Sequence, residues 1–101
     1  MAGISKPKAR SLLANVPEEY VFWCINGHIL RNMRELRDEF GSMSNESYVF
    51  HTSGEKNDFS NWVADIIKDE ELARDLRNAP DQAWAAKTVA GRVDTLAKKL
   101  A

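Results

Sequence analysis

The sequence has few of the residues that build disulfide frameworks, metal centres and nucleotide-binding loops. Among its 101 residues there are one cysteine, Cys24, and two histidines. A single cysteine excludes an internal disulfide and multi-cysteine zinc sites, as suits a reducing compartment, so we expect a cytoplasmic protein. The five glycines are scattered and match neither of the common phosphate-binding patterns. The sequence therefore predicts no metal and no cofactor.

Long apolar runs and an excess of positive charge are also missing. No stretch approaches the roughly 20 apolar residues of a membrane span, so we expect no membrane insertion. Fourteen Lys and Arg against fifteen Asp and Glu give a net charge of −1, which argues against nucleic acid as a partner. The hydrophobic share of 44% is that of a folded chain. We expect one folded domain over residues 14–101.

The first thirteen residues are predicted to form a flexible basic arm. Its sizeable apolar groups are few, and its positive charges lie around Pro7. Chain termini are usually loose, which favours a solvated arm. The alternative is weak binding of a nucleic acid or another anionic surface through Lys6, Lys8 and Arg10.

A β-hairpin is predicted near the N-terminus. Residues 20–25 are β-branched and aromatic, Asn26-Gly27 suits a tight turn, and residues 28–31 return as a second strand. Both alternating sets of side chains in the first strand are apolar. We therefore expect helices to cover the ribbon on more than one side.

Helices are predicted for the rest of the chain. Four polar residues stand where a side chain can accept hydrogen bonds from the free N–H groups of a helix start. The clearest apolar stripe runs through residues 59–67 at helical spacing and makes Trp62 a core residue. The sequence predicts an α+β fold, mainly α, in which an N-terminal two-stranded β-hairpin packs on a bundle of four to five helices. The predicted N-cap residues are Asn32, Ser44, Asp69 and Asp81.

Three side chains could carry chemistry. Cys24 lies in a strand among aromatic residues, where burial suppresses the reactive thiolate. His28 follows the turn, where it stacks across the ribbon or faces solvent. His51 precedes a loop that can bring the Asp58 carboxylate back to the imidazole and fix its tautomer. Without a nucleophile in register, this pair is expected to tie the loop to a helix start, and we assign no catalytic residue.

Two segments resemble a family of small archaeal and bacterial domains of unknown function. These are Met43–His51, which ends in the histidine, and Lys56–Val63, with the pattern Asn-Asp-Phe-x-x-Trp-Val; the resemblance runs from about Val16 to the end. It implies a mainly helical domain that occurs alone or attached to unrelated proteins, without an established activity. It also implies a shared structural signature of His51, Asn57, Asp58, Phe59 and Trp62.

The leading functional hypothesis is a noncatalytic protein–protein interaction or adaptor module. Trp84 lies at the margin of the apolar stripe of the last helix, where a partly exposed ring can anchor a protein partner or a second copy. The competing interpretation is that Trp84 covers the hairpin. A second hypothesis is a small ligand-binding or regulatory protein with a pocket at His51 and Asp58.

Overall fold

The computed structural model describes residues 3–101 as six α-helices and one antiparallel hairpin, which confirms the predicted α+β, mainly α, fold. The two strands pair with Phe22 opposite Leu30 and Trp23 opposite Ile29. In chain order the elements are α1 (Lys6–Leu13), the 3-10 turn η1 (Glu18–Tyr20), β1 (Phe22–Trp23), β2 (Ile29–Leu30), α2 (Met33–Ser42), α3 (Asn45–Thr52), α4 (Asp58–Trp62), the π-helical turn η2 (Val63–Ile67), α5 (Glu70–Arg77) and α6 (Gln82–Leu100).

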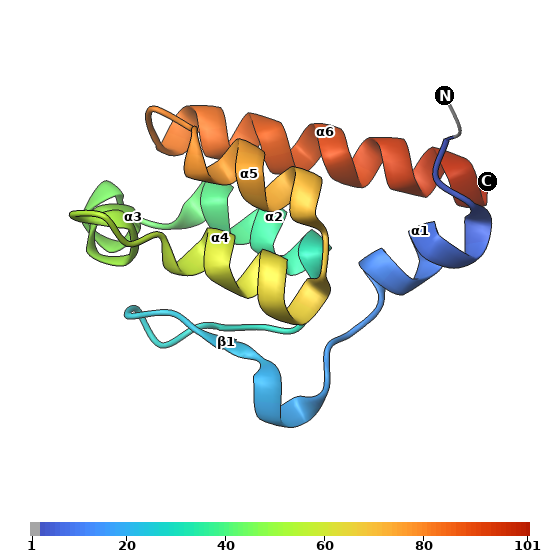
Figure 1. The fold of residues 1–101 in the computed structure, drawn as a ribbon. Helices are drawn as coiled ribbons and strands as arrows, with labels where there is room; N and C mark the ends of the chain where they lie inside the picture. The colour runs from blue at the N-terminus through green and yellow to red at the C-terminus, as the bar shows by residue number, and fades with distance from the viewer. Residues whose placement is uncertain (1–2) are drawn as a thin grey trace.

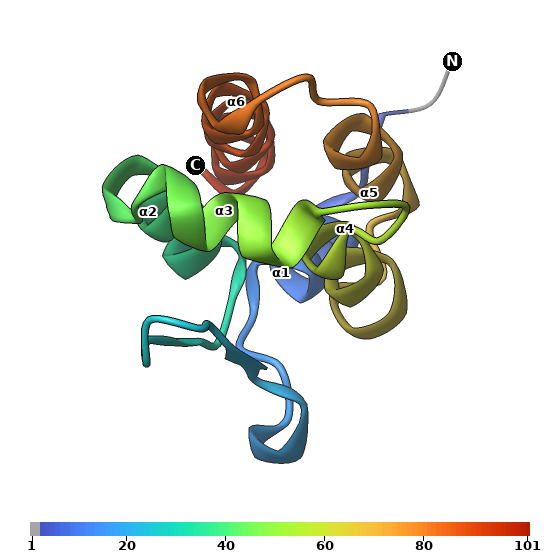
Figure 2. The same ribbon diagram turned by 90° about the vertical axis from the view of Figure 1, so that its left-hand side faces the viewer.

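The helices form a bundle with the hairpin on one side (Figure 1). The long helix α6 runs along one side and packs against α1, α2 and α5. Helices α2, α3 and α4 lie between α6 and the hairpin, as Figure 2 shows from the end of the bundle. Within the described residues, no helix combines the length and the apolar content that crossing a bilayer requires.

The predicted N-caps begin four of the helices. In each case a side-chain oxygen of the cap accepts a hydrogen bond from the backbone N–H three residues later, at distances of 2.8–3.1 Å. These bonds satisfy donors that a helix start would otherwise leave free. The caps are Asn32 for α2, Ser44 for α3, Asp69 for α5 and Asp81 for α6.

The predicted flexible arm of residues 1–13 is wrong from Lys6 onward, where α1 begins. Ser5 caps this helix with a hydrogen bond from the N–H of Lys8, and Pro7 stands in its first turn, where its missing N–H costs nothing. Ala9, Leu12 and Leu13 are buried on the side that packs against α6. Their spacing of three and four residues is a short helical stripe, so the ordered chain begins well before residue 14.

The expectation that the ribbon is covered on more than one side is also wrong. Phe22 and Cys24 are buried against the helices, whereas Trp23 and Ile25 are 67% and 55% exposed. The ribbon has only two strands and lies at the side of the bundle, so helices reach one of its faces. The other apolar face is bare.

The predicted helix over residues 59–67 is present but changes its geometry midway. Residues 58–62 are α-helical, and η2 continues them as one π-helical turn. Lys68 then ends the segment in the left-handed conformation, with φ 71° and ψ 37°, and its N–H donates to the carbonyl oxygen of Val63 at 2.7 Å. This turn places Ile67 and Lys68 beside the segment that follows α1.

Candidate functional site

The aromatic core centres on Phe59, one of the signature residues. Its ring lies 4.8–5.1 Å, between centroids, from those of Phe22, Phe40 and His51. Trp62 is buried beside it and donates from Nε1 to the carbonyl oxygen of Tyr20 at 2.7 Å. These contacts join the hairpin side of the molecule to α2, α3 and α4.

Asn57 holds the start of α4 in two ways. Its Oδ1 accepts from the N–H of Ser60 at 3.0 Å, and its Nδ2 donates to the carbonyl oxygen of Leu76 at 3.2 Å. Sequence reasoning gave Asn57 no cap role, although an asparagine before a helical stripe is a common cap. One side chain therefore fixes the start of α4 and the end of α5.

His51 and Asp58 form the predicted pair. The Nδ1 of His51 lies 2.9 Å from the Oδ2 of Asp58, and its Nε2 accepts a hydrogen bond from the N–H of Ile25 at 3.0 Å. Because Nε2 is an acceptor, the ring proton sits on Nδ1 and is donated to the carboxylate. Lys56 lies 3.5 Å from the same carboxylate oxygen. Both nitrogens of this buried ring are thus used by the fold, which leaves neither to a ligand or a reacting group.

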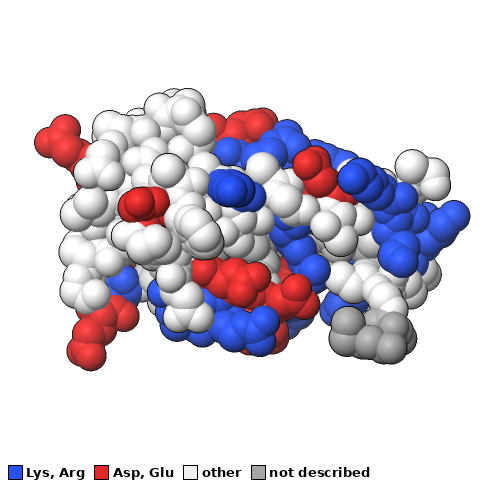
Figure 3. All heavy atoms as spheres, turned by 90° about the horizontal axis from the view of Figure 1, so that it is seen from above, with Lys and Arg blue, Asp and Glu red and all other residues white. Residues whose placement is uncertain are grey.

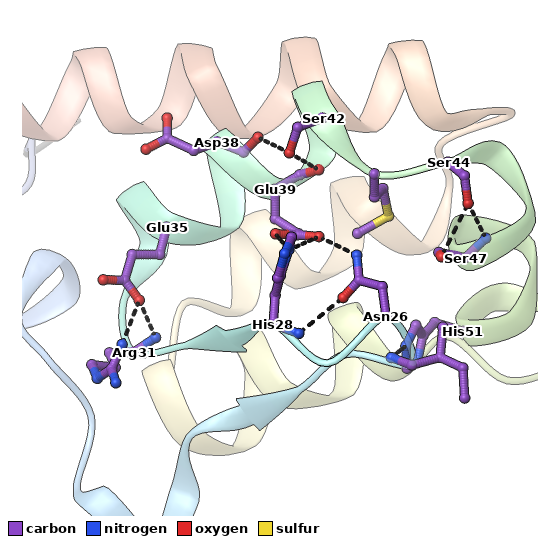
Figure 4. A network of polar contacts seen from close by, with 12 residues as sticks. Asn26, His28, Arg31, Glu35, Asp38, Glu39, Ser42, Ser44, Ser47 and His51 are labelled. Atoms are coloured by element: carbon purple, nitrogen blue, oxygen red, sulfur yellow. Dashed lines mark hydrogen bonds and ion pairs between the residues drawn. The ribbon is translucent and has the colours of Figure 1, made fainter.

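A second polar cluster, which sequence reasoning missed, holds the hairpin turn on α2 (Figure 4). Glu39 is only 6% exposed, and its carboxylate accepts from Nδ2 of Asn26 at 2.7 Å and from Nδ1 of His28 at 2.8 Å. The Oδ1 of Asn26 accepts in turn from the N–H of His28 at 3.0 Å. Glu39 precedes Phe40 on the buried side of α2. A carboxylate at a buried helix position needs a hydrogen-bond partner, and this is the feature of the sequence that could have predicted the cluster.

The two clusters fix the hairpin turn from two helices. His51 of α3 binds the backbone of Ile25, and Glu39 of α2 binds both side chains that flank Gly27. Gly27 itself has a φ of 95°, which glycine adopts without strain. The turn is therefore held in one position relative to the helices.

Cys24 is expected to be unreactive in the folded protein. Burial, assisted by the nearby negative charge of Glu39, raises the pKa of its thiol from 9.0 to about 12. At pH 8 we expect 5,5′-dithiobis(2-nitrobenzoate) to modify the native protein at least ~100-fold more slowly than the guanidinium-unfolded chain. Equal rates in the two states would contradict this burial.

The raised pKa of the Cys24 thiol also determines how the stability of the protein depends on pH. Because the folded pKa lies above the ordinary value, the protonated thiol contributes stability that is fully present below about pH 9. That contribution declines as the pH rises from about 9 toward 12. Comparing denaturant melts of the protein and of Cys24→Ala across this range isolates the effect.

The other predicted site residues lie apart from these clusters. Trp84 is 54% exposed on α6, with the ammonium of Lys87 5.9 Å from its ring centroid. Since α6 lies across the bundle from the hairpin, Trp84 does not cover the hairpin (Figure 1).

Lys6, Lys8 and Arg10 lie on α1, near the C-terminal end of α6, where Lys and Arg side chains gather (Figure 3). Within residues 3–101, no three His, Cys, Asp or Glu side chains are grouped so that they could hold a metal ion.

Exposed apolar side chains concentrate around the hairpin, which sequence reasoning did not anticipate. Trp23 and Ile25 alternate with the buried Phe22 and Cys24, so they share the outer face of β1 and the turn. Phe50, also exposed, lies next to His51 with 5.1 Å between ring centroids, and His51 in turn binds Ile25. We call the set of Trp23, Ile25 and Phe50 the hairpin surface.

Comparisons of this chain with protein-family models, with curated proteins and with solved structures found no match, so its resemblance to a family of small prokaryotic domains stays a prediction.

Proposed function

We propose that this protein is a noncatalytic interaction module of the cytoplasm, which binds another polypeptide through the hairpin surface. The observation that carries the proposal is the exposure of Trp23 and Ile25, at 67% and 55%, on one face of a ribbon whose other face is buried. Large apolar side chains that share an exposed face are typical of surfaces that bind a protein. Tryptophan in particular dominates the binding energy of many interfaces.

The rigid mounting of the hairpin supports the same proposal. Its turn is fixed by Glu39 and His51, and β1 packs on the aromatic core through Phe22. A surface that is already ordered loses little conformational entropy when a partner binds. The hairpin surface can therefore present its apolar groups at low entropic cost.

The contacts of His51 support a noncatalytic role. Its Nδ1 donates to Asp58 and its Nε2 accepts from the N–H of Ile25, so neither nitrogen of this ring is free. A general base needs a free nitrogen within reach of the proton it removes. The buried Cys24 thiol, with its raised pKa, is a poor nucleophile.

Three variants, each of which alters one candidate binding surface, test the role of the hairpin surface. Trp23→Ser removes the largest exposed group of the hairpin surface, Trp84→Ser removes the exposed ring of α6, and Lys6→Gln/Lys8→Gln/Arg10→Gln neutralises α1. We expect Trp23→Ser to weaken association at least ~10-fold, about 1.4 kcal/mol, without unfolding the domain. Sedimentation velocity up to 200 µM (about 2 mg/mL) measures self-association, and affinity capture from source cells measures binding of other proteins.

The other two variants separate the competing surfaces. Binding lost only in the Trp84→Ser protein would move the interface to α6. Binding lost only in the α1 variant, together with a steep dependence on salt, would favour an anionic partner. Association that survives Trp23→Ser unchanged would refute the role of the hairpin surface.

A further inference from the structure

A groove lies between the segment that follows α1 and the end of η2, away from the hairpin surface. The chain runs extended through residues 14–17 beside the π-helical turn (Figure 1). The groove has a volume of about 290 Å³ and is lined by residues of α1, by residues 14–17 and by Ile66, Ile67 and Lys68. A second hollow of about 370 Å³ shares Pro17, Ile66 and Lys68 with it and extends to Tyr20. The two hollows are neighbours, since they share these three lining residues.

Part of the lining of the groove is apolar. Leu12 and Ile67 are buried beneath it, and Val16 and Ile66 are partly buried at its sides. Pro17 and the ring of Tyr20 extend this lining into the second hollow. The apolar body of a ligand would cover these side chains.

The rim at the α1 end is polar and positively charged. Lys8 and Lys68 line it together with Ser11 and Asn15. Among the described residues, neither Lys8 nor Lys68 takes part in a salt bridge. The Oδ1 of Asn15 accepts from Asn32 at 2.7 Å, which leaves the amide N–H groups of Asn15 as donors. Two cations and neutral donors favour an anionic head group.

The one acidic residue among those that line the two hollows belongs to the second hollow, which Lys68 also lines. Asp65 lines the second hollow, together with Tyr20 and Pro17, and does not line the groove beside Lys8. Repulsion by its carboxylate orients an anionic ligand with its head toward Lys8 and its apolar tail toward Tyr20.

The backbone of Lys68 is also unusual. Its φ of 71° makes it the one non-glycine residue with positive φ among residues 3–101. Glycine takes this conformation at no steric cost and would end the helix equally well through the same N–H. A lysine here accepts strain, and the property that glycine lacks is an ammonium group at the rim of the groove. Strained residues of this kind cluster at binding sites.

We propose that this groove binds a small amphipathic anion, an aliphatic carboxylate whose head group pairs with Lys8 and Lys68 and whose chain covers Leu12 and Ile66. The site is independent of the hairpin surface. It adds a small-molecule ligand to a protein proposed above to bind another polypeptide.

Octanoate is the probe, and octylammonium and octanol are its controls. In a ¹⁵N-labelled sample of the full chain we expect octanoate to shift the amide signals of Ser11, Asn15, Ile67 and Lys68 with a Kd on the order of 1 mM. Octylammonium is expected to shift none of these signals, and octanol is expected to bind at least ~5-fold more weakly than octanoate. Equal shifts by all three compounds, or octanoate shifts confined to the hairpin surface, would overturn the proposal.

Lys68→Gly distinguishes a ligand-binding lysine from a purely structural cap. Glycine relieves the strain, so we expect a Tm that is unchanged or higher, together with a Kd for octanoate at least ~5-fold weaker. Lys8→Gln is expected to weaken octanoate to a similar degree. Lys87→Gln, which removes a charge on α6 that lines neither hollow, is the matched control and should bind as the unmodified protein does. Unchanged octanoate binding by both Lys68→Gly and Lys8→Gln would refute the site.

Discussion

Replacing Trp62 with alanine is expected to lower the free energy of unfolding by about 3–5 kcal/mol. The indole is buried against Phe22, with ring centroids 5.6 Å apart, and its loss leaves a cavity beside Phe59 in the aromatic core. It also removes the hydrogen bond from Nε1 to the carbonyl oxygen of Tyr20. Urea melts followed by circular dichroism measure the change.

Trp62→Phe separates the two contributions. Phenylalanine keeps most of the apolar volume but cannot donate to Tyr20, so we expect a smaller loss of about 1–3 kcal/mol. A loss below about 1 kcal/mol for Trp62→Ala would show that the ring does not support the core.

Arg92→Leu is expected to destabilise the protein by about 3–5 kcal/mol. The guanidinium of Arg92 binds the Asp69 carboxylate through two hydrogen bonds, from Nε at 2.7 Å and from a terminal nitrogen at 3.0 Å. Asp69 is buried and also caps α5 through the N–H of Leu72. Removing the guanidinium leaves a buried carboxylate without its cation, which is the costly half of breaking such a pair.

Two further variants test this reason. In Arg92→Leu/Asp69→Asn the carboxylate charge is gone while the amide oxygen still caps α5, so the double variant should be more stable than Arg92→Leu alone. Arg37→Leu breaks the exposed pair with Asp38, at 3.0 Å, and should change stability by less than about 1 kcal/mol. Equal losses for Arg92→Leu and Arg37→Leu, from thermal or urea melts, would contradict the importance of burial.

The parts of the fold that sequence predicted well depend on neighbours in the chain. Asn32, Ser44, Asp69 and Asp81 each bind a backbone N–H three residues away, so their spacing alone carries the information. The apolar stripe that begins at Phe59 is local in the same sense. The pairing of His51 with Asp58 spans only seven residues and one loop, which made it a specific prediction.

The parts that sequence missed depend on contacts between distant segments. Asp69 was predicted as a cap, but its ion pair joins it to Arg92, 23 residues away. Glu39 binds the hairpin turn 11 and 13 residues before it, and α1 is stabilised by packing on α6 at the other end of the chain. Short helices such as α1 are marginal alone, so propensity could not reveal it. The exposure of Trp23 was hidden because an apolar strand face looks the same in sequence whether it is covered or bare.

The hydrogen bonds at the two ends of β1 also protect the sheet from uncontrolled growth. An exposed strand edge is a template on which other chains can add strands and form aggregates. Here Trp62 donates to the carbonyl oxygen of Tyr20 just before β1, and His51 accepts from the N–H of Ile25 just after it. On the far side of the hairpin, the N–H of Val16 donates to the carbonyl oxygen of Arg31, just after β2, at 2.8 Å. For the interaction proposed above, these contacts favour binding to the apolar face of the ribbon over strand addition at its edge.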